Sequence, residues 1–426
     1  MSKKNDLEHT STTLGSQNMK SSQRMVSVVE PYELPEGWKW VQQNEVCKLS
    51  DGEKRTGTEF PYLEVKYLRG KKEKDFVSTG KFIKAGTKVI LVDGENSGEV
   101  FTVPEDGFMG STFKALEISN VNENYLQYFI HTKKDLYRNN KKGSAIPHLD
   151  KKLFFTMPFP LPPTLAEQQR IVNRIESMFA KLDEAKEKAQ NVVDGFETRK
   201  AAILHKAFTG ELTAKWRKEN GVSDDSWEEK KLQEVCIKEI TDGTHKTPTY
   251  VDEKTGVPFI SGKDVSNEII DWSDLRYIPK ALHEELYARL APQIDDILLS
   301  KNGARLGKAA IVETNMIFDI YVTLALLRPN KKNIFPKYLW RVINSPSIQS
   351  QIQNHLTGIG MPNLHLRDIK ALSMFVPTLP EQVEIVRILD IIIEKENKAK
   401  QAAEAVLEQI DLLKKSILAR AFRGKI

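Results

Sequence analysis

Asp51 and the triplet Glu64-Val65-Lys66 have the residue types that could hold a magnesium ion for cleavage of a DNA strand. Carboxylates bind this hard cation, and a lysine beside them stabilises the negative charge that develops during hydrolysis. The pattern is short and arises often by chance. A similar stretch recurs later in the chain, where Ser261 stands in place of Glu64 and Lys263 corresponds to Lys66. Because the acid is not shared, DNA contact explains the lysines better than catalysis.

Motifs for other kinds of DNA chemistry are missing from the sequence. It contains neither the glycine-rich cofactor loop and Asn/Asp-Pro-Pro-aromatic motif of a base methyltransferase nor the Gly-x-x-x-x-Gly-Lys-Ser/Thr loop of a motor. Its two cysteines, Cys47 and Cys236, stand at equivalent positions, and we expect them to be small core residues. No zinc-binding constellation accompanies them. We therefore expect a non-catalytic protein with no metal or other cofactor, in a reducing cytoplasm.

Basic and amide side chains are concentrated in a few stretches, where they could contact phosphates and read base edges in the major groove. The loop Asp-Gly-x-x-(Lys or Arg)-Thr occurs twice, at 51–56 and 242–247. A single lysine cluster is as often a solvated face, and the shared Asp and Gly also suit a simple turn. The predicted DNA-binding residues are Lys54, Arg55, Lys66, Arg69, Lys71, Lys72, Lys74, Lys141, Lys142, His245, Lys246, Lys263, Lys301, Asn302, Arg305 and Lys308.

The overall composition is typical of a globular protein, with 40% hydrophobic and 28% charged residues. A formal net charge of +5 is only a weak sign of polyanion binding. No apolar run reaches the roughly 18 residues that a spanning helix needs, so we expect no membrane segment.

An internal duplication organises the chain. Glu45-Val46-Cys47 returns as Glu234-Val235-Cys236, and GSAIPHL at 143–149 matches GIGMPNL at 358–364. From Glu167, which matches Glu381, the two copies align without a gap at an offset of 214 residues. Each copy is divergent in its first part and constant in its last part. This pattern suggests two readers of different targets mounted on a common frame.

Each constant segment carries the signals of a long helix. Capping boxes at 164–167 and 378–381 mark the starts, and Gly210 and Gly424 mark the ends. Apolar residues recur between them at spacings of three and four, as in a coiled coil. The two predicted seams are Ile171, Ile175, Met178, Leu182, Ala185, Ala189, Val192, Phe196 and Ile203, and Ile385, Leu389, Ile392, Ala399, Ala403, Val406, Ile410, Leu413 and Ile417.

A charged residue interrupts each seam, Arg199 in the first and Glu396 in the second. If the helices pack antiparallel with residue numbers at each contact summing to 595, the apolar positions meet and Arg199 faces Glu396. A matched pair within a seam favours one alignment at some cost in stability. We therefore predict that this pair sets the register. About 40 residues at 1.5 Å each make a rod of roughly 60 Å, longer than a DNA turn of about 34 Å, although simple core packing is an alternative role.

The divergent segments, at about 34–160 and 222–376, show mixed patterns. Strand-like runs at 88–92 and 297–300 precede glycine turns, and helical patterns follow at 124–137 and 336–355. The predicted fold class is mixed α/β, with two globular domains separated by two long helices that form an antiparallel coiled coil. The domains form a pseudo-two-fold internal repeat.

The segments LPPTLAEQQRIVNRI at 161–175 and VPTLPEQVEIVRI at 376–388 resemble the conserved regions of Type I restriction specificity subunits, the HsdS family. Each leads into a long helix that ends in Ile-Leu-x-x-Ala-Phe-x-Gly, and the stretch from Gly210 resembles the inter-domain link of that family. The resemblance covers nearly the whole chain after residue 34.

This resemblance implies a particular domain order and set of partners. After a flexible N-terminal tail at 1–33, it implies a target recognition domain at 34–160, a conserved helical region at 161–213, a linker with a second recognition domain at 214–376, and a second helical region at 377–426. Each domain would read half of a split double-stranded DNA target, and the helices would set the gap and bind two methyltransferase (modification) subunits. Restriction/translocase subunits would join for cleavage.

The resemblance also has implications for cofactors, for the DNA-contacting residues and for the position of residues 421–424, and it leaves other functions open. S-adenosylmethionine, Mg and ATP would be bound by partner subunits, and the DNA-contacting residues of the family vary too much to transfer by position. Residues 421–424 resemble residues 207–210. This likeness implies that residues 421–424 lie near residues 34–40. A stand-alone nuclease, a coiled-coil scaffold and a silent subunit that serves as a recombination donor stay open as other functions.

Overall fold

A computed structural model describes residues 32–142, 147–356 and 362–426 of the chain. Unit 1 contains the chain up to Glu184 together with Gln409–Ile426, and unit 2 contains Ala185–Glu408. Nearly all of the tail expected at 1–33, and parts of the glycine loops at 143–149 and 358–364, lie outside the described residues. No helix among the described residues is both long and apolar enough to cross a membrane.

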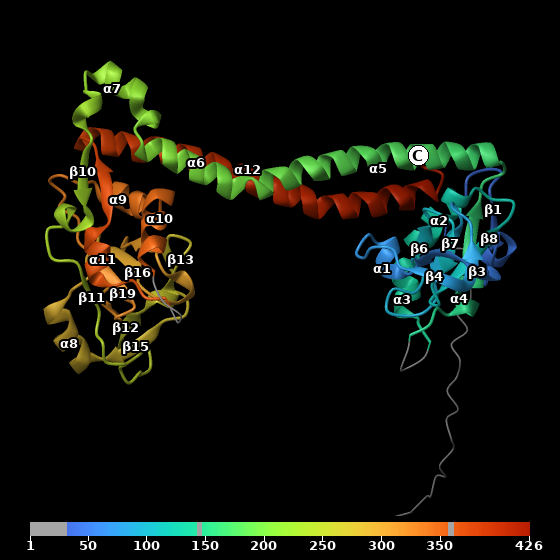
Figure 1. Ribbon diagram of the computed structural model, residues 1–426, viewed down its shortest axis with the longest axis horizontal. Helices are drawn as coiled ribbons and strands as arrows, with labels where there is room; N and C mark the ends of the chain where they lie inside the picture. Colours follow the sequence, from blue (N-terminus) through green and yellow to red (C-terminus); the bar gives the residue numbers. More distant parts are fainter. Residues whose placement is uncertain (1–31, 143–146, 357–361) are drawn as a thin grey trace, which may run out of the picture. The chain divides into compact units, whose positions relative to one another are not determined.

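The globular part of unit 1 combines three sets of strands with short helices (Figure 1). The strands are the pair β1 (Lys39–Gln42) and β9 (Pro158–Leu161), the sheet β2 (Cys47–Ser50), β8 (Phe113–Ile118), β5 (Lys88–Leu91) and β6 (Val100–Thr102), and the closed barrel β3 (Glu53–Leu63), β4 (Phe76–Ile83) and β7 (Gly107–Met109). The helices are α1 (Val65–Leu68), α2 (Glu123–Thr132), α3 (Lys134–Asn139) and α4 (Lys151–Phe155).

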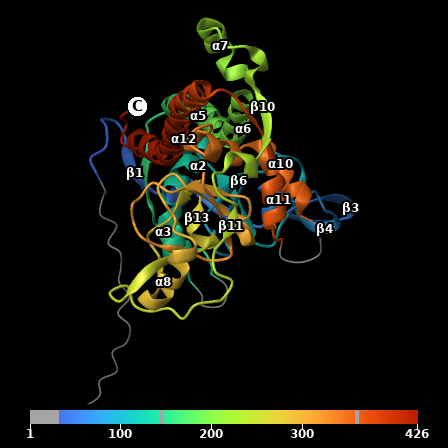
Figure 2. The same ribbon diagram turned by 90° about the vertical axis from the view of Figure 1, so that its left-hand side faces the viewer.

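Unit 2 repeats these three sets of strands and adds a short two-stranded hairpin. The strands are the pair β10 (Glu228–Lys231) and β20 (Ser373–Val376), the sheet β11 (Thr241–Asp242), β19 (Leu324–Leu327), β16 (Ile297–Ser300) and β17 (Ala309–Ile311), the sheet β15 (Arg276–Pro279), β12 (Gly256–Ile260) and β18 (Asp319–Ile320), and an additional hairpin of β13 (Val265–Ser266) and β14 (Ile269–Ile270). The helices are α7 (Ala214–Asn220), α8 (Lys280–Arg289), α9 (Pro336–Ile343), α10 (Pro346–His355) and α11 (Leu366–Ala371). Figure 2 shows α7 projecting from the rest of this unit.

The strand pairings confirm the internal repeat. The four-stranded sheets have the orders β2-β8-β5-β6 and β11-β19-β16-β17, which correspond strand by strand. In the three-stranded sets, β3 and β12 each pair antiparallel with one neighbour and parallel with the other. The expected strands at 88–92 and 297–300 are β5 and β16, and the helical patterns at 124–137 and 336–355 are α2 with α3 and α9 with α10.

The two constant segments form long helices that pack together. Together with the strands and short helices of the two globular parts, they confirm the predicted mixed α/β fold class. The first segment is α5 (Leu165–Asp194) followed by α6 (Phe196–Phe208), and the second is the continuous helix α12 (Leu379–Ala421). In unit 1, Ile171 and Ile175 of α5 share a buried cluster with Leu418 of α12. In unit 2, Leu204 of α6 shares one with Leu389. Each unit therefore contains a globular domain and the adjoining parts of both helices.

The helix ends follow the sequence signals only in part. Thr164 Oγ1 accepts the Glu167 N–H at 3.1 Å, as in the predicted capping box. Glu381, the corresponding acid of α12, is fully buried and instead accepts hydrogen bonds from Thr213, Arg217 and Trp227. Gly210 and Gly424 follow the ends of α6 and α12 with φ of 84° and 66°, the left-handed conformation that favours glycine at these positions.

The apolar seam of α12 differs from the predicted one at three positions. Ala399 is exposed, and Val406 and Leu413 are 41% and 46% exposed, whereas Ala403 and Ile410 are buried as expected. Lys414 instead turns toward α5, with its ammonium 5.1 Å from the Phe179 ring centroid and 2.5 Å from Asp183. A long aliphatic stem can cover apolar surface while its charged end stays solvated, so a lysine serves at this seam position.

Arg199 and Glu396 meet in unit 2, as the predicted register requires. Arg199 Nε donates to Glu396 Oε2 at 2.8 Å, and Arg199 Nη2 donates to the Val192 carbonyl. Nearby, Lys400 lies over the Phe196 ring, so residue numbers fall along α6 as they rise along α12 and the helices are antiparallel. The break between α5 and α6 falls at Gly195, where an added Cβ would lie 2.5 Å from Arg199 Nη1. Glycine here leaves room for the guanidinium to cross the helix surface.

We expect the Arg199–Glu396 pair to show a coupling energy of about 0.5–1 kcal/mol in a double-mutant cycle with Arg199→Ala and Glu396→Ala. The side chains are 38% and 26% exposed, so solvent screens the pair only in part. Urea titration read out by amide exchange in α6 would measure it. The matched exposed pair Lys398–Glu394 should show no more than about 0.5 kcal/mol. Equal coupling in the two cycles would contradict a special role for Arg199.

Candidate nucleic-acid interface

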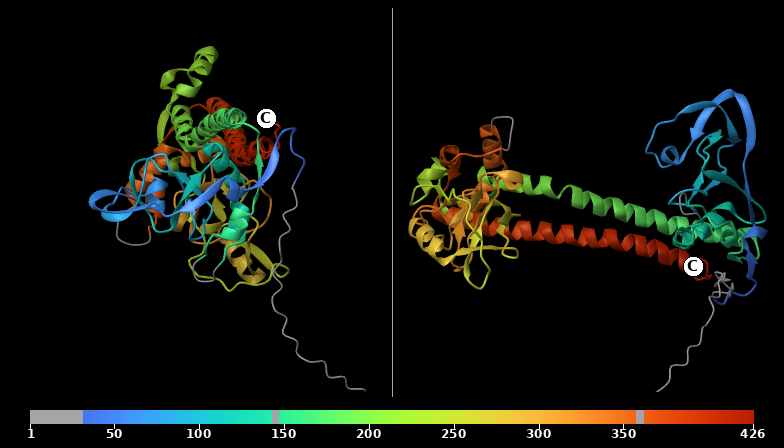
Figure 3. Two further views of the ribbon diagram at one scale, coloured as in Figure 1. Left: turned by 90° about the vertical axis from the view of Figure 1, so that its right-hand side faces the viewer. Right: turned by 90° about the horizontal axis from the view of Figure 1, so that it is seen from below.

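The β3–β4 hairpin carries the first predicted DNA-binding residues away from the core of unit 1, and Figure 3 shows it projecting from that unit. Residues 51–59 are exposed, and Lys54 lies opposite Lys81 in the strand register. Arg55 stacks on Phe82, with its guanidinium carbon 3.8 Å from the ring centroid, and pairs with Glu53. An exposed hairpin with cationic side chains on a rigid aromatic base suits contact with a phosphate backbone.

The segment after β3 contains five further predicted residues in two different states. Lys66 and Lys71 are exposed and make no ion pair among the described residues. Arg69, Lys72 and Lys74 are already bound to carboxylates of Glu99, of Glu64 and Asp75, and of Glu105, respectively. An unpaired ammonium can bind a phosphate without first breaking an ion pair. Lys66 and Lys71 are therefore the stronger candidates in this segment.

Lys141 and Lys142 stand at the edge of the loop 143–146, which lies outside the described residues. Lys141 binds Glu95 at 2.6 Å and Lys142 binds Asp150 at 3.0 Å. Beyond the gap, His148 Nδ1 lies 2.6 Å from a carboxylate oxygen of Asp93 in the loop after β5. The structure thus brings Lys142 and His148, on either side of this gap, together with the loop after β5.

In unit 2, Asp242 organises the loop that repeats the Asp-Gly motif. Its carboxylate binds the Lys301 ammonium and lies 3.2 Å from His245 Nε2, and its carbonyl accepts from Arg289 of α8 at 2.9 Å. Lys301 is only 6% exposed. The prediction of Lys301 as a DNA contact therefore needs correction, because its buried ammonium holds the loop in place. His245 and Lys246 remain exposed on this loop.

The loop after β16 corresponds to the loop after β5 and holds the other predicted residues of unit 2. Asn302 forms a bridge with Asn363, as Asp93 does with His148 in unit 1. Arg305 donates to the Lys263 carbonyl, and Lys263 also pairs with Asp274 at 3.2 Å. A separate position on the same loop, Lys308, is exposed and makes no ion pair among the described residues. Among the predicted residues of unit 2, Lys246 and Lys308 are therefore the stronger candidates for contact with DNA.

Arg276 and Tyr250 form a further candidate contact that the sequence does not reveal. Arg276 Nη1 donates to the Tyr250 hydroxyl at 3.1 Å, and its guanidinium carbon lies 4.8 Å from the ring centroid. Both side chains are accessible, and planar groups of this kind can stack on bases. The residues are 26 positions apart and meet through the β12–β15 pairing, so no local pattern marks them.

The weak metal-site pattern does not assemble. Asp51 binds Lys81 and Lys114, and Glu64 binds Lys72, so the two acids are engaged with different lysines. No group of three His, Cys, Asp or Glu side chains that could hold a metal occurs within residues 32–142, 147–356 and 362–426. Cys47 is buried and Cys236 is half-buried, as expected for packing residues.

Hydrogen bonds from Lys114 and Lys81 lower the pKa of Asp51 to about 2. We expect the double variant Lys81→Met/Lys114→Met to return this pKa toward 3.8 in a carboxyl NMR titration. A lowered folded-state pKa stabilises above pH 3.8, and this contribution disappears as the pH falls toward 2. It is small, because Asp51 is exposed. A midpoint near 3.8 in the parent protein would disprove both contacts.

A family model described as Type I restriction modification DNA specificity domain matches residues 35–193 and 224–409 of the chain. The chain is 27% identical over 421 residues to the Type I restriction enzyme MjaVIII specificity subunit of Methanocaldococcus jannaschii, covering 92% of this chain and 94% of that protein. It is also 26% identical over 304 residues to the Type I restriction enzyme EcoBI specificity subunit of Escherichia coli, covering 67% and 62% of the two chains.

Two solved structures have the same fold. One is the HsdS subunit from Thermoanaerobacter tengcongensis, with a TM-score of 0.63, 21% identity and coverage of 93% of this chain and 99% of that one. The other comes from work on complex assembly and conformational transition of the type I R-M system, with a TM-score of 0.66, 21% identity and coverage of 93% and 100%. At this identity the likeness supports the fold and not the individual contacts.

Proposed function

Because the chain belongs to the Type I restriction modification DNA specificity family, we propose that its two globular domains each read one half of a bipartite duplex target. It is a specificity subunit of a type I restriction-modification system and is not itself catalytic. S-adenosylmethionine, ATP and Mg belong to the modification and restriction subunits of such systems. The strand pairing order repeats in two units whose loops differ, and this repetition is the main support for two half-sites.

The differing loops support separate half-sites. Among the predicted DNA-binding residues, Lys54, Lys66 and Lys71 of unit 1 and Lys246 and Lys308 of unit 2 are exposed and make no ion pair within the described residues. Phosphate contacts position a protein on DNA without selecting a sequence, so base selection would come from neighbouring groups. Because those groups differ between the units, two different half-sequences are the natural targets.

The long helices offer a docking surface for two modification subunits. On α12, several large apolar side chains remain exposed in the chain alone: Val383 47%, Ile391 42%, Val406 41%, Leu412 67% and Leu413 46%. Exposed apolar stripes of this kind mark protein interfaces. We propose that modification subunits cover them, that restriction/translocase subunits join the complex for cleavage, and that the assembly acts in the cytoplasm.

Sequencing of methylated adenines in cells with and without this gene tests the proposal. We expect loss of one bipartite motif on deletion, and loss of only one half of that motif when residues 34–160 are replaced by those of a relative. A protein that cuts or methylates DNA unaided would indicate a stand-alone enzyme instead. An unchanged methylome together with sequence-selective binding by the assembled complex would indicate a silent donor subunit, and absence of selective binding would indicate a scaffold.

A further inference from the structure

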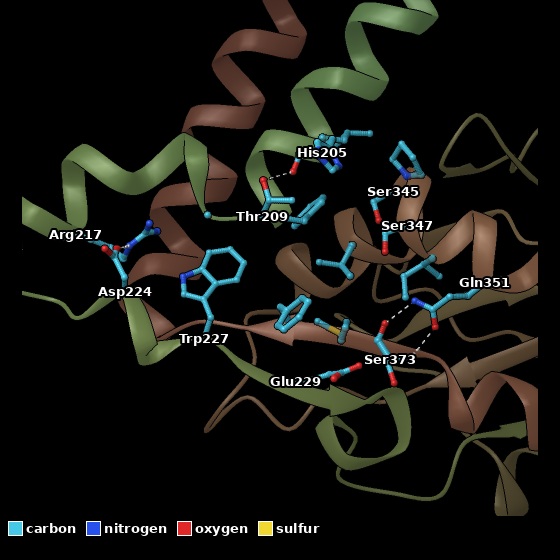
Figure 4. A pocket seen from close by; sticks show the side chains of 18 residues that line it. His205, Thr209, Arg217, Asp224, Trp227, Glu229, Ser345, Ser347, Gln351 and Ser373 are labelled. Atoms are coloured by element: carbon cyan, nitrogen blue, oxygen red, sulfur yellow. Dashed lines mark hydrogen bonds and ion pairs between the residues drawn. The ribbon is translucent and has the colours of Figure 1, made fainter.

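A cavity of about 1030 Å³ opens on unit 2 beside the end of α6, α10 and the β10–β20 pair. Its apolar wall includes Phe208, Val342 and Met374. Figure 4 shows Trp227 and Glu229 on one side of this space and Ser345 on another. The cavity lies apart from the loops that carry the candidate DNA contacts, so the proposed function leaves it unused.

Ser345 contributes a polar group that lacks a partner. The residue is 1% exposed, and its Oγ makes no hydrogen bond within the described chain. It precedes α10 at the N-cap position, yet its side chain makes no capping bond. An unpaired buried hydroxyl costs about 1–3 kcal/mol. A ligand with a hydrogen-bonding group in the cavity would remove this cost.

The internal repeat identifies the corresponding place in unit 1. Tyr125 of α2 donates its hydroxyl to the Pro160 carbonyl at 3.0 Å, and Tyr338 of α9 donates to the Phe375 carbonyl at 2.8 Å. Pro160 and Phe375 lie on the equivalent strands β9 and β20. The two tyrosines are therefore equivalent, as are the two strand residues.

Two further pairs complete this correspondence. Phe422 packs on the tyrosine of unit 1 with ring centroids 5.0 Å apart, and Phe208 packs on that of unit 2 at 5.5 Å. The strand registers place Trp40 opposite Pro160 of β9 and Glu229 opposite Phe375 of β20. The cavity next to Phe208 and Glu229 thus corresponds to the space next to Phe422 and Trp40.

Aromatic side chains fill that space in unit 1. Tyr32 packs on Trp40 with centroids 5.0 Å apart and donates its hydroxyl to the Phe422 carbonyl at 2.9 Å. Phe129 packs on both Phe159 and Phe422 at 4.9 and 5.4 Å. Arg423 lies over the Tyr32 ring, 5.0 Å from its centroid. Unit 1 therefore closes this site with a tyrosine from a preceding segment and a guanidinium beside it.

Unit 2 has smaller or acidic residues at the same positions. Val342 stands one helical turn after Tyr338, where unit 1 has Phe129, and Met374 stands where it has Phe159. Glu229 replaces a tryptophan and is exposed, with no ion pair among the described residues. Its acidity disfavours a nucleic acid and favours a cationic neighbour. The space can therefore take an aromatic ring, and Glu229 beside it is complementary to a positive charge.

We propose that this cavity binds an aromatic side chain on a segment of a partner protein, with a lysine or arginine beside it that pairs with Glu229. The aromatic ring would pack against Phe208 and Val342 as Tyr32 packs in unit 1, and a hydroxyl on the ring would reach Ser345. The proposal stands on the cavity and the repeat, and it does not depend on which DNA sequence the protein reads.

The test uses the full chain labelled with ¹³C in its methionine methyl groups and the probe acetyl-Arg-Tyr-Arg-amide. We expect a saturable shift of the Met374 resonance, with methionines of unit 1 as internal references. Acetyl-Arg-Ala-Arg-amide should produce no such shift, and acetyl-Glu-Tyr-Glu-amide should bind at least about threefold more weakly because of Glu229. Equal shifts from the tyrosine and alanine peptides would overturn the proposal.

Three variants separate binding in the cavity from binding elsewhere. Val342→Phe should weaken the probe at least tenfold by filling the space, whereas Ile317→Phe, at an exposed position just before β18, should leave it unchanged. Ser345→Ala should leave the melting temperature unchanged or higher and abolish the preference for tyrosine over phenylalanine in the probe. This variant keeps the test decisive if the larger side chain disturbs folding. Unchanged affinity in both cavity variants would contradict the proposed site.

Discussion

Replacement of Arg217 by alanine is expected to lower the free energy of unfolding of unit 2 by about 3–5 kcal/mol. Arg217, on α7, donates to a carboxylate oxygen of Glu381 at 2.6 Å, and the same oxygen accepts from Thr213 at 2.6 Å and Trp227 at 3.2 Å. The Glu381 side chain is fully buried and that of Arg217 is 8% exposed. Without its guanidinium partner, the carboxylate would be a buried charge that only the neutral donors of Thr213 and Trp227 still contact.

The matched control for this prediction lies in the other copy of the repeat. Glu167 corresponds to Glu381 but is 30% exposed and pairs with Arg170, which is 54% exposed. Arg170→Ala should therefore cost less than about 1 kcal/mol. Urea titration read out by amide exchange in the first turns of α5 and α12 would compare the variants. A similar loss for both would show that burial of Glu381 does not dominate its energetics.

Removal of three unpaired lysines is expected to weaken DNA binding on the order of 100-fold at 0.15 M salt. In the triple variant Lys54→Gln/Lys66→Gln/Lys71→Gln, each lost phosphate contact would reduce the slope of log K against log salt by about 0.9. Base preference should stay unchanged, because phosphate contacts do not read sequence. Anisotropy of a labelled duplex that carries the methylated motif, measured with the assembled complex at several salt concentrations, gives both quantities.

A second triple variant controls for the loss of charge itself. Lys72, Lys74 and Lys141 lie in the same unit but already bind carboxylates. Their replacement by glutamine should change affinity by less than about tenfold, because a local acid already offsets each charge. Equal losses in the two triple variants would mean that net charge governs binding. A changed base preference would mean that one of the unpaired lysines reads a base.

Features with a periodic or repeated signal could be predicted from the sequence. The duplication, the helix ends at Gly210 and Gly424 and the meeting of Arg199 with Glu396 all follow from spacing along the chain. The contact implied between 421–424 and 34–40 is also present, because Gly424 lies against Pro35. The helix ends depend on local geometry that repeats every few residues, and the two long-range contacts follow from that periodicity together with the duplication.

The misplaced seam positions show where this reasoning fails. Val406 and Leu407 are adjacent apolar residues, and a spacing of three or four allows either to point inward. The structure leaves Val406 exposed and brings Lys414, about two turns later, to the contact with Phe179. Apolarity alone predicted Leu413 for that place, since no rule of spacing anticipates that a lysine stem serves as a core contact.

Long-range ion pairs outside the helix seam could not be predicted either. Lys301 binds Asp242 from 59 positions away, and Arg217 binds Glu381 from 164 positions away. Each looks like an ordinary charge in the sequence. Only the tertiary fold determines that these charges are buried and paired, so the sequence could not separate Lys301 from the exposed candidates for DNA contact.

The order in which the chain is synthesised has a consequence for unit 1. Leu418, Ala421 and Phe422 belong to the same buried cluster as Val46 and Ile171, although the whole of unit 2 is translated between them. The first domain to leave the ribosome therefore waits for the last helix before its interior is complete, while the second domain can fold ahead of it. A premature stop codon shortly after residue 408 would chiefly damage the domain encoded at the opposite end of the gene.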